Sequence, residues 1–479
     1  MSFLRVTIAI YWLVKWRNTL NNLSVLDWLP LGLYPILLLY LGLRARRQKT
    51  DQEEFLLSGR SLALPAFVAT LVTTWYGGIL GVGEFTYTYG VSVWFVFGLP
   101  YYLFALLFAF MLAGRIRTAN IYSIPDMFYR KYGRKSGLLG SAFLMIITSP
   151  APYILMLGVL LQEIAGLPFM IAVFVGTLFS MIYIWWGGFR SVVQTDRLQF
   201  VLMFGGFILL FVFLANSDLS VGQLFSVLDE THKSPLGEMG WQELAVWFLI
   251  AAWTFIDPGF HQRCAAAKSP KVARNGILVS VVFWFIFDIL TLITGLYAYI
   301  LLPDINPVMS FPLLAFAILP PLLKGLFITG LLAIIMSTID SYSFLSALTF
   351  GRDLVGRWKN ATDDDERVNR WVRWGLLFTA VVAVGLILMT PSVIRLWYHL
   401  GSLFLPPLLL PVLGNYFPKL KVNSRSAFAI MFLSFSVAIT VYLWGQFHLI
   451  NSQPTYPLDV QPFFGGMLGS AIGWMWRKQ

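Results

Sequence analysis

The stretch TTWYGGILGVGE, residues 73–84, interrupts an apolar run that is otherwise long enough to cross a membrane. It contains four glycines and ends on a carboxylate, Glu84. A glycine costs a helix roughly 1 kcal/mol relative to alanine, and a charged side chain at the bilayer centre costs about 2.5–3.5 kcal/mol on insertion scales. A membrane helix that carries both is predicted to be broken here.

The composition of the chain indicates an integral membrane protein. Of its 479 residues, 58% are hydrophobic and 12% are charged, and the mean hydropathy is +0.73. Soluble domains carry about 25% charged residues. The apolar runs are too long for the alternating strands of a β-barrel. We therefore expect an all-α membrane protein with about thirteen spans of roughly 20 residues, at 26–43, 63–88, 91–113, 138–162, 167–188, 198–215, 241–262, 275–302, 322–350, 374–390, 393–414, 426–447 and 461–476.

The basic residues indicate membrane topology rather than a nucleic-acid surface. The net charge is +11, but 28 of the 34 Lys and Arg residues fall in connections on one side of the predicted spans. One of these connections, 263–274, is taken to begin at Arg263. Because cytoplasmic loops collect Lys and Arg, the C-terminus is predicted to be cytoplasmic and residue 26 to lie outside. The expected location is the cell membrane, plasma or inner.

The domain organisation is expected to be simple. Residues 1–25 form an N-terminal extension, for which an interfacial amphipathic helix, a signal peptide and a mis-assigned start remain open. Residues 26–476 form a single membrane domain. The one cysteine, Cys264, excludes an intramolecular disulfide and a Cys-cluster metal site. The chain has no GxxxxGK[ST] motif, which disfavours an ATP-driven pump.

A second interruption lies in AAWTFIDPGFHQR, residues 251–263, where Asp257-Pro258-Gly259 falls inside the seventh span. Proline removes a hydrogen-bond donor, and each unsatisfied backbone group costs several kcal/mol in a membrane. The two interrupted spans are five apart, so they cross the bilayer in opposite directions. Glycines in membrane helices often serve only close packing. A matched pair of breaks in inverted halves, however, indicates the central binding site of a secondary transporter.

The ninth span contains GLLAIIMSTIDSYSFLSALTFGRD, residues 330–353, and supplies candidate cation ligands. Ile334, Ser337 and Thr338 have i, i+3, i+4 spacing and share one helical face. Two hydroxyls and the carbonyls of a broken helix suit a hard cation such as sodium. The alternative is that both hydroxyls bond to the preceding turn or to a neighbouring helix.

This span resembles the signature of the sodium:solute symporter family, which includes sugar, proline, pantothenate and sialic acid symporters. Further matches follow in the expected order: FLLSGRSLALPAF at 55–67, IPDMFYRKYG at 124–133, WWGGFRSVVQTDRLQF at 185–200, HQRCAAAKSPKVARNGI at 261–277 and FPLLAFAILPPLLKGL at 311–326. The resemblance implies a LeuT-type fold, a five-plus-five inverted repeat with flanking helices. The first repeat would be 63–215, the second 241–414, and 426–476 would form extra C-terminal helices.

The resemblance also implies ion sites. Carried over without gaps from the shared GRSL, the family's main sodium site uses the carbonyls of Thr73, Tyr76 and Ile334 and the hydroxyls of Ser337 and Thr338. A second sodium site of some members corresponds to Asp196, Ser337, Asp340 and Ser341. Asp340 stands where sialic acid-type members have a hydroxyl. Three roles stay open for it: strengthening a cation site, binding a proton, or pairing with an arginine such as Arg190 or Arg197.

The solute cavity of this family lies between the two interrupted spans. Asp257, Trp284 and Leu80 replace an asparagine, a lysine and a glutamine that contact sugar in galactose-type members, so a sugar is not favoured. Asp288 is an additional carboxylate in the membrane, either functional or held by a structural hydrogen bond. The aromatic candidates for stacking on or gating a solute are Trp75, Tyr76, Trp253 and Phe260. We expect a solute with amine or hydroxyl groups, and a zwitterion with sodium as its counter-charge is the alternative.

Together these features predict a sodium-coupled symporter that imports a small organic solute by alternating access. Sodium is the expected coupling ion, no enzymatic activity and no nucleic-acid partner are expected, and one protomer in the bilayer should suffice. One rival is a proton-coupled symporter on the same fold, which the additional aspartates favour. The other is a membrane sensor that does not transport.

Overall fold

The computed structural model describes residues 23–45, 51–237, 239–450 and 453–475. The helices in chain order are α2 (Trp28–Arg44), α3 (Gln52–Leu57), α4 (Leu64–Trp75), α5 (Ile79–Tyr89), α6 (Leu99–Phe108), α7 (Gly114–Thr118), α8 (Ile124–Ile147), α9 (Ala151–Ala165), α10 (Phe169–Ala215), α11 (Val221–Val227), α12 (Glu230–Lys233), α13 (Trp241–Ile250), α14 (Pro258–Ala266), α15 (Pro270–Leu301), α16 (Ser310–Ile318), α17 (Leu323–Leu348), α18 (Asp365–Met389), α19 (Val393–Tyr416), α20 (Ser424–Phe447) and α21 (Pro462–Met475). Two short strands, β1 (Leu449–Ile450) and β2 (Gln453–Pro454), pair antiparallel. Residues 1–22 of the predicted extension lie outside the described residues.

The prediction of an all-α membrane protein is confirmed, although the number of spans is not. Ten helical segments of the described chain are long and apolar enough to cross a membrane. The predicted spans 167–188 and 198–215 lie on the single helix α10, which bends at Gly188. The predicted span 138–162 is divided between α8 and α9, because Pro150 precedes the first turn of α9. The helices α2 and α21, which correspond to the first and last predicted spans, have 17 and 14 described residues and are not among these ten.

Side-chain caps fix where several helices begin. Ser123 accepts a hydrogen bond from the Asp126 N–H at 3.1 Å to start α8, and Ser269 accepts one from the Val272 N–H at 3.2 Å to start α15. Asp27 instead caps a distant helix: its Oδ1 accepts from the backbone N–H groups of Leu322 at 2.8 Å and Gly325 at 3.1 Å. The start of α2 is thereby fastened to the start of α17.

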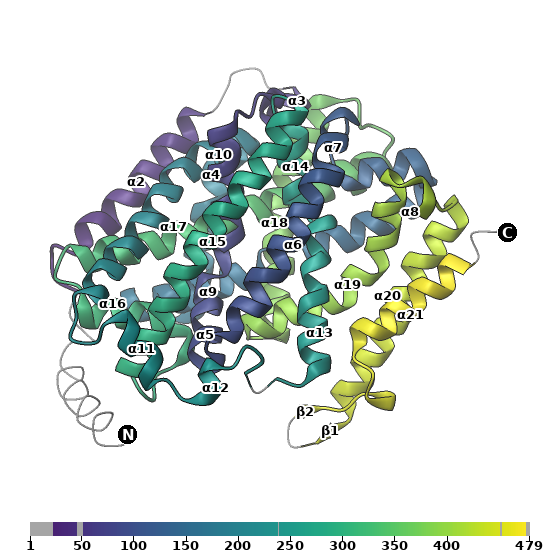
Figure 1. Ribbon diagram of the computed structural model, residues 1–479. Helices are drawn as coiled ribbons and strands as arrows, with labels where there is room; N and C mark the ends of the chain where they lie inside the picture. The colour runs from purple at the N-terminus through teal and green to yellow at the C-terminus, as the bar shows by residue number, and fades with distance from the viewer. Residues whose placement is uncertain (1–22, 46–50, 238, 451–452, 476–479) are drawn as a thin grey trace.

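The helices form a bundle, in which α17 is labelled between α2 and α15 (Figure 1). Almost every side chain of α17 is buried, as expected of a helix that is apolar on all sides. It packs against α10, α4, α9, α18 and the turn between α4 and α5. At one edge α2 packs on α10 and α17, and at the opposite edge α20 and α21 pack on each other and on α19 (Figure 1).

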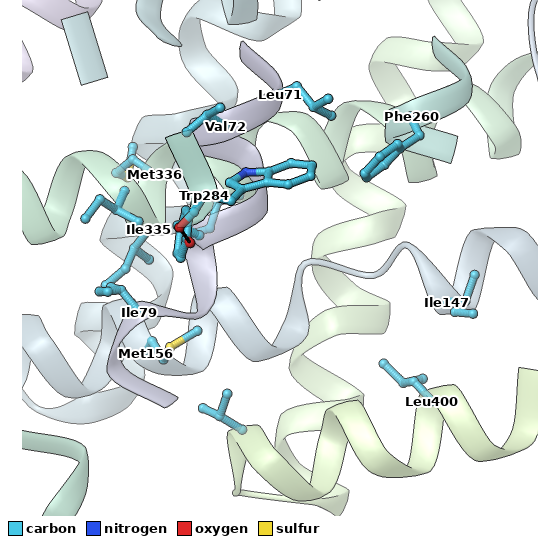
Figure 2. Close-up of a cluster of buried hydrophobic side chains, with 14 of the residues drawn as sticks. Leu71, Val72, Ile79, Ile147, Met156, Phe260, Trp284, Ile335, Met336 and Leu400 are labelled. Atoms are coloured by element: carbon cyan, nitrogen blue, oxygen red, sulfur yellow. Dashed lines mark hydrogen bonds between the residues drawn. The ribbon is translucent and has the colours of Figure 1, made fainter. Parts of the chain in front are cut away.

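An apolar cluster surrounds the interruption of the second span. Figure 2 shows Leu71 and Val72 of α4 and Ile79 of α5 near Ile335 and Met336 of α17. Leu71 is 2% exposed, and Val72, Ile79 and Ile335 are fully buried. The polar groups at the interruption therefore lie in a setting that excludes water, where each needs a partner.

Candidate functional site

The second span is interrupted by a single 3₁₀ turn, Tyr76–Gly78, between α4 and α5. Two of its glycines are required by contact. A Cβ on Gly77 would lie 1.9 Å from Thr338 Oγ1, and a Cβ on Gly78 would lie 2.2 Å from the ring of Trp397. The glycines therefore serve close packing as well as the interruption, since they let the turn rest directly on α17 and α19.

The five residues predicted for the main sodium site come together at this turn. All are buried: Thr73, Tyr76, Ile334, Ser337 and Thr338. Thr338 Oγ1 donates to the carbonyl oxygen of Thr74 at 2.8 Å, and Ser337 Oγ donates to Asp196 Oδ1 at 2.6 Å. The two hydroxyls of α17 thus reach the end of α4 and the neighbouring carboxylate of α10.

The side chains of Thr73 and Tyr76 are engaged elsewhere, which leaves their carbonyls as the candidate ligands. Thr73 Oγ1 donates to the carbonyl oxygen of Ala69 at 2.8 Å. The Tyr76 hydroxyl donates to Asp288 Oδ1 at 2.6 Å and lies 2.8 Å from the Trp284 carbonyl oxygen.

An arginine occupies the region predicted for a second sodium. Arg263 was assigned to a cytoplasmic connection, but it lies on α14 with 0% of its surface exposed. Its Nη2 donates to Ser341 Oγ at 2.8 Å and lies 4.0 Å from Asp196 Oδ2. The assignment to a solvated loop is therefore wrong, because α14 continues past the Asp-Pro-Gly interruption and keeps this side chain inside the bundle.

Asp340 faces α10. Its Oδ2 accepts a hydrogen bond from the Tyr183 hydroxyl at 2.5 Å, and its Oδ1 accepts one from Ser180 Oγ. Of the two arginines suggested as partners, Arg190 forms an ion pair with Glu54. Arg197 donates to Gln194 Oε1 at 3.4 Å.

A cavity of about 100 Å³ lies between the two interruptions. Of the predicted solute residues, the lining includes Trp75, Tyr76, Trp253, Asp257 and Asp288. Asp257 Oδ1 accepts from the Phe260 N–H at 3.0 Å, and its Oδ2 accepts from the Tyr342 hydroxyl at 2.7 Å. Asp288 is held by Tyr76 and by the hydroxyl of Tyr102. Hydroxyl donors thus hold both carboxylates in place at the cavity.

The other predicted solute residues lie behind this lining. The ring of Trp284 lies 5.3 Å from that of Trp75, and the ring of Phe260 lies 5.9 Å from it. Both side chains are labelled in Figure 2, above the turn of the second span. Leu80 is fully buried on α5 and is not part of the lining.

The sequence did not single out several residues of the site. The cavity lining also includes Tyr101, Tyr153, Trp247, Tyr342 and Trp397. Aromatic residues make up 16% of the chain, so these gave no distinct signal. Arg263 did have a usable sequence signal. An arginine six residues after Asp257 in a broken span is still within reach of the membrane interior.

Comparisons with known proteins identify the family of the chain. The model of the sodium:solute symporter family matches residues 55–433. The chain is 25% identical to the sodium/pantothenate symporter of Haemophilus influenzae, over 94% of this chain and 97% of that protein. It is 26% identical to the osmoregulated proline transporter OpuE of Bacillus subtilis, over 94% of this chain and 95% of that protein.

The fold is similar to the substrate-bound, outward-open structure of a Na+-coupled sialic acid symporter. The TM-score is 0.79 at 18% identity, covering 95% of this chain and 97% of that one. This likeness confirms the LeuT-type architecture. The family and the relatives named above are transporters, so the predictions of a transporter and of sodium as its coupling ion are confirmed. Since the family model matches most of its length, the chain belongs to the sodium:solute symporter family.

Proposed function

We propose that this symporter binds its coupling sodium where the turn of the second span meets the Ser-Thr pair of α17, and binds its solute in the adjoining cavity. The observation that carries the proposal is the contact of Thr338 with this turn. Its hydroxyl donates to the Thr74 carbonyl at 2.8 Å, and only glycine fits beside it at position 77.

The chemistry of the proposed ligands suits sodium. Sodium is a hard cation that prefers oxygen, and the proposed set is made only of carbonyls and hydroxyls: Thr73, Tyr76, Ile334, Ser337 and Thr338. The Asp196 carboxylate, 2.6 Å from Ser337 Oγ, adds negative charge beside the set. A bound ion would join α4 to α17 and satisfy polar groups that are otherwise buried in an apolar setting.

Tyr76 offers a direct route from ion to solute. Its carbonyl belongs to the proposed sodium site, and its phenol donates to Asp288 at the cavity. An ion that fixes the backbone at Tyr76 also fixes the phenol that orients this carboxylate. Sodium binding would therefore raise the affinity for the solute, and by linkage a bound solute would raise the affinity for sodium by the same factor.

The cavity favours a solute that carries an amine. Asp257 and Asp288 both line it, and none of its described lining residues is Lys, Arg or His. The faces of its tryptophans and tyrosines attract organic cations. This reading is tested with choline and its uncharged isostere dimethylbutanol as probes. We expect only choline to stabilise the protein in sodium, and equal stabilisation by both would argue against a cationic solute.

We propose alternating access in which the repeats 63–215 and 241–414 move relative to each other, with the C-terminus in the cytoplasm of a cell whose plasma or inner membrane holds the protein. One protomer contains every group named here. A single charge crossing a potential of about 100 mV releases about 2.3 kcal/mol, which is enough to drive substantial accumulation.

The test of the proposed function is transport into proteoliposomes over a panel of amines, amino acids, vitamins, nucleosides and sugars. We expect uptake of at least one solute that requires an inward sodium gradient and stops when potassium replaces sodium. Uptake that persists without sodium and collapses with the pH gradient would select the proton-coupled rival. Failure of the whole panel with a protein that does respond to sodium would favour a sensor.

A further inference from the structure

We propose that the guanidinium of Arg263 is a permanent internal cation that takes the position of a second sodium, so that one sodium ion is coupled to each solute. The inference rests on the proposed main sodium site. It concerns the neighbouring site predicted from Asp196, Ser337, Asp340 and Ser341.

The guanidinium binds oxygens as a metal ion would. Its Nη2 lies 2.8 Å from Thr74 Oγ1, 2.8 Å from Ser341 Oγ and 3.0 Å from Thr70 Oγ1, and 3.4 Å from the Thr70 carbonyl oxygen. Thr74 Oγ1 and Ser341 Oγ are also within 2.9 Å of each other. The hydroxyl of Ser341 therefore already has two protein partners, Arg263 and Thr74.

Asp196 supplies the counter-charge. Both Arg263 and Asp196 are fully buried, and Nη2 lies 4.0 Å from Asp196 Oδ2. Thr70 joins them, since its hydroxyl donates to Asp196 and accepts from Arg263. A buried charge is stable only when it is paired and hydrogen-bonded. Arg263 already supplies a positive charge to this carboxylate, which reduces the attraction that a further cation would feel between Asp196 and Ser341.

The remaining predicted ligand is also committed elsewhere. Both oxygens of Asp340 accept hydrogen bonds from α10, from Ser180 and Tyr183. Of the four residues predicted for the second site, only Ser337 is also predicted for the main site. Its hydroxyl donates to Asp196. Each member of the predicted second site therefore has a protein hydrogen-bond partner.

The same arginine connects the moving parts of the proposed transporter. It stands on α14, after the interruption of the seventh span, and it contacts Thr70 and Thr74 of α4 and Ser341 of α17. The ring of Phe189 on α10 lies 5.4 Å from its guanidinium carbon. A fixed charge at this junction holds α14 against the helices that form the main site, a task that an exchangeable ion would perform only when bound.

The test is equilibrium binding of radioactive sodium to the purified full-length protein. We expect one ion per protein at saturation and a titration without cooperativity. Ser341→Ala should still bind one ion, because its oxygen serves the arginine. Arg263→Lys keeps a positive charge and should also bind one. Arg263→Ser removes the charge, and we expect this variant to bind two ions or to need high sodium for stability.

The outcomes separate this inference from the proposed function. Two ions per wild-type protein, with one lost in Ser341→Ala, would overturn the role of Arg263 and leave sodium coupling intact. No bound sodium in the wild type would overturn the proposed function itself. If Arg263→Ser does not fold, the wild-type and Ser341→Ala counts still decide the matter.

Discussion

The two interrupted spans differ in how the backbone groups at the interruption find hydrogen-bond partners. In the second span, the 3₁₀ turn Tyr76–Gly78 has no side-chain cap among the described residues, and its glycines rest on Thr338 and Trp397. In the seventh span, a 3₁₀ turn at Ala251–Phe255 leads to Asp257, whose carboxylate caps α14 at the Phe260 N–H.

The seventh span satisfies its own broken backbone. Thr254 Oγ1 donates to the Ala251 carbonyl at 2.9 Å, and His261 Nε2 lies 2.9 Å from the Phe255 carbonyl oxygen. The second span instead relies on a hydroxyl from α17. This difference agrees with the proposed division of roles, in which the uncapped break supplies backbone oxygens to the ion and the capped break supplies a carboxylate to the solute.

The largest effect should come from filling the space at the uncapped break. In Gly77→Ala the new Cβ would lie 1.9 Å from Thr338 Oγ1, so the turn must move away from α17. We expect a destabilisation of about 1–3 kcal/mol, typical of overpacking, and loss of sodium-dependent stabilisation. Thermal unfolding with and without sodium measures both.

The matched control is Gly385→Ala on α18, where no atom lies within 4 Å of the added Cβ. Alanine there should raise stability by about 0.5–1 kcal/mol, because glycine weakens a helix interior. A sodium response that is the same in Gly77→Ala as in this control would break the proposed distinction between the two spans.

Tyr76→Phe should separate the carbonyl of this residue from its phenol. The variant keeps the carbonyl but removes the hydrogen bond to Asp288. Hydrogen bonds to charged groups contribute about 1.5–3 kcal/mol, so solute affinity should fall about tenfold or more while sodium affinity is retained. Sodium titrations with and without the transported solute give both numbers. Equal losses for ion and solute would mean that the phenol supports the whole turn.

Substitutions of Asp257 separate its role as the cap of α14 from its proposed role as a charge at the solute cavity. Asp257→Ala removes the cap of α14 and should cost about 0.5–2 kcal/mol, whereas Asp257→Asn keeps an oxygen that can accept from the Phe260 N–H. Both variants lose the charge at the cavity and should bind an amine solute less tightly. Thermal unfolding measures the loss of the cap, and titration with an amine solute measures the loss of the charge. If Asp257→Asn binds an amine as well as the wild type does, the carboxylate is only a cap.

The smallest effect is expected at Thr73. Its hydroxyl donates to the Ala69 carbonyl oxygen and also interacts with the Asp196 carboxylate. Because neither contact involves the Thr73 carbonyl, Thr73→Val should change stability by about 0.5–1.5 kcal/mol and change sodium affinity little. A large drop in sodium affinity, measured by the same titration, would mean that the side chain and not the carbonyl binds the ion.

Local sequence was sufficient for most of the membrane helices and for the two central breaks, because apolar length, glycine and proline act within a few residues. It also placed Ser337 and Thr338 on one face of α17. The interruption of the fourth span was readable in Ser149-Pro150-Ala151-Pro152, but it was not identified.

The position of Arg263 inside the bundle could be suspected from the sequence, but its hydrogen-bond partners could not be identified because they are distant in the chain. Thr70 and Thr74 are 193 and 189 residues away, and Ser341 is 78 residues away. In the sequence, a charged residue at the end of an apolar run is typical of the start of a loop. Only the fold shows that three hydroxyls surround this charge. Leu80 illustrates the reverse case, since an alignment without gaps gave it a solute role and the fold buries it outside the cavity lining.

The central claim is that sodium joins the uncapped turn of the second span to the Ser-Thr pair of α17. Its most direct test is the sodium dependence of thermal unfolding for the purified wild type and for the double variant Ser337→Ala/Thr338→Ala. We predict that sodium raises the unfolding temperature of the wild type, that potassium does not, and that the double variant does not respond to sodium. An undiminished sodium response in the double variant would contradict the claim.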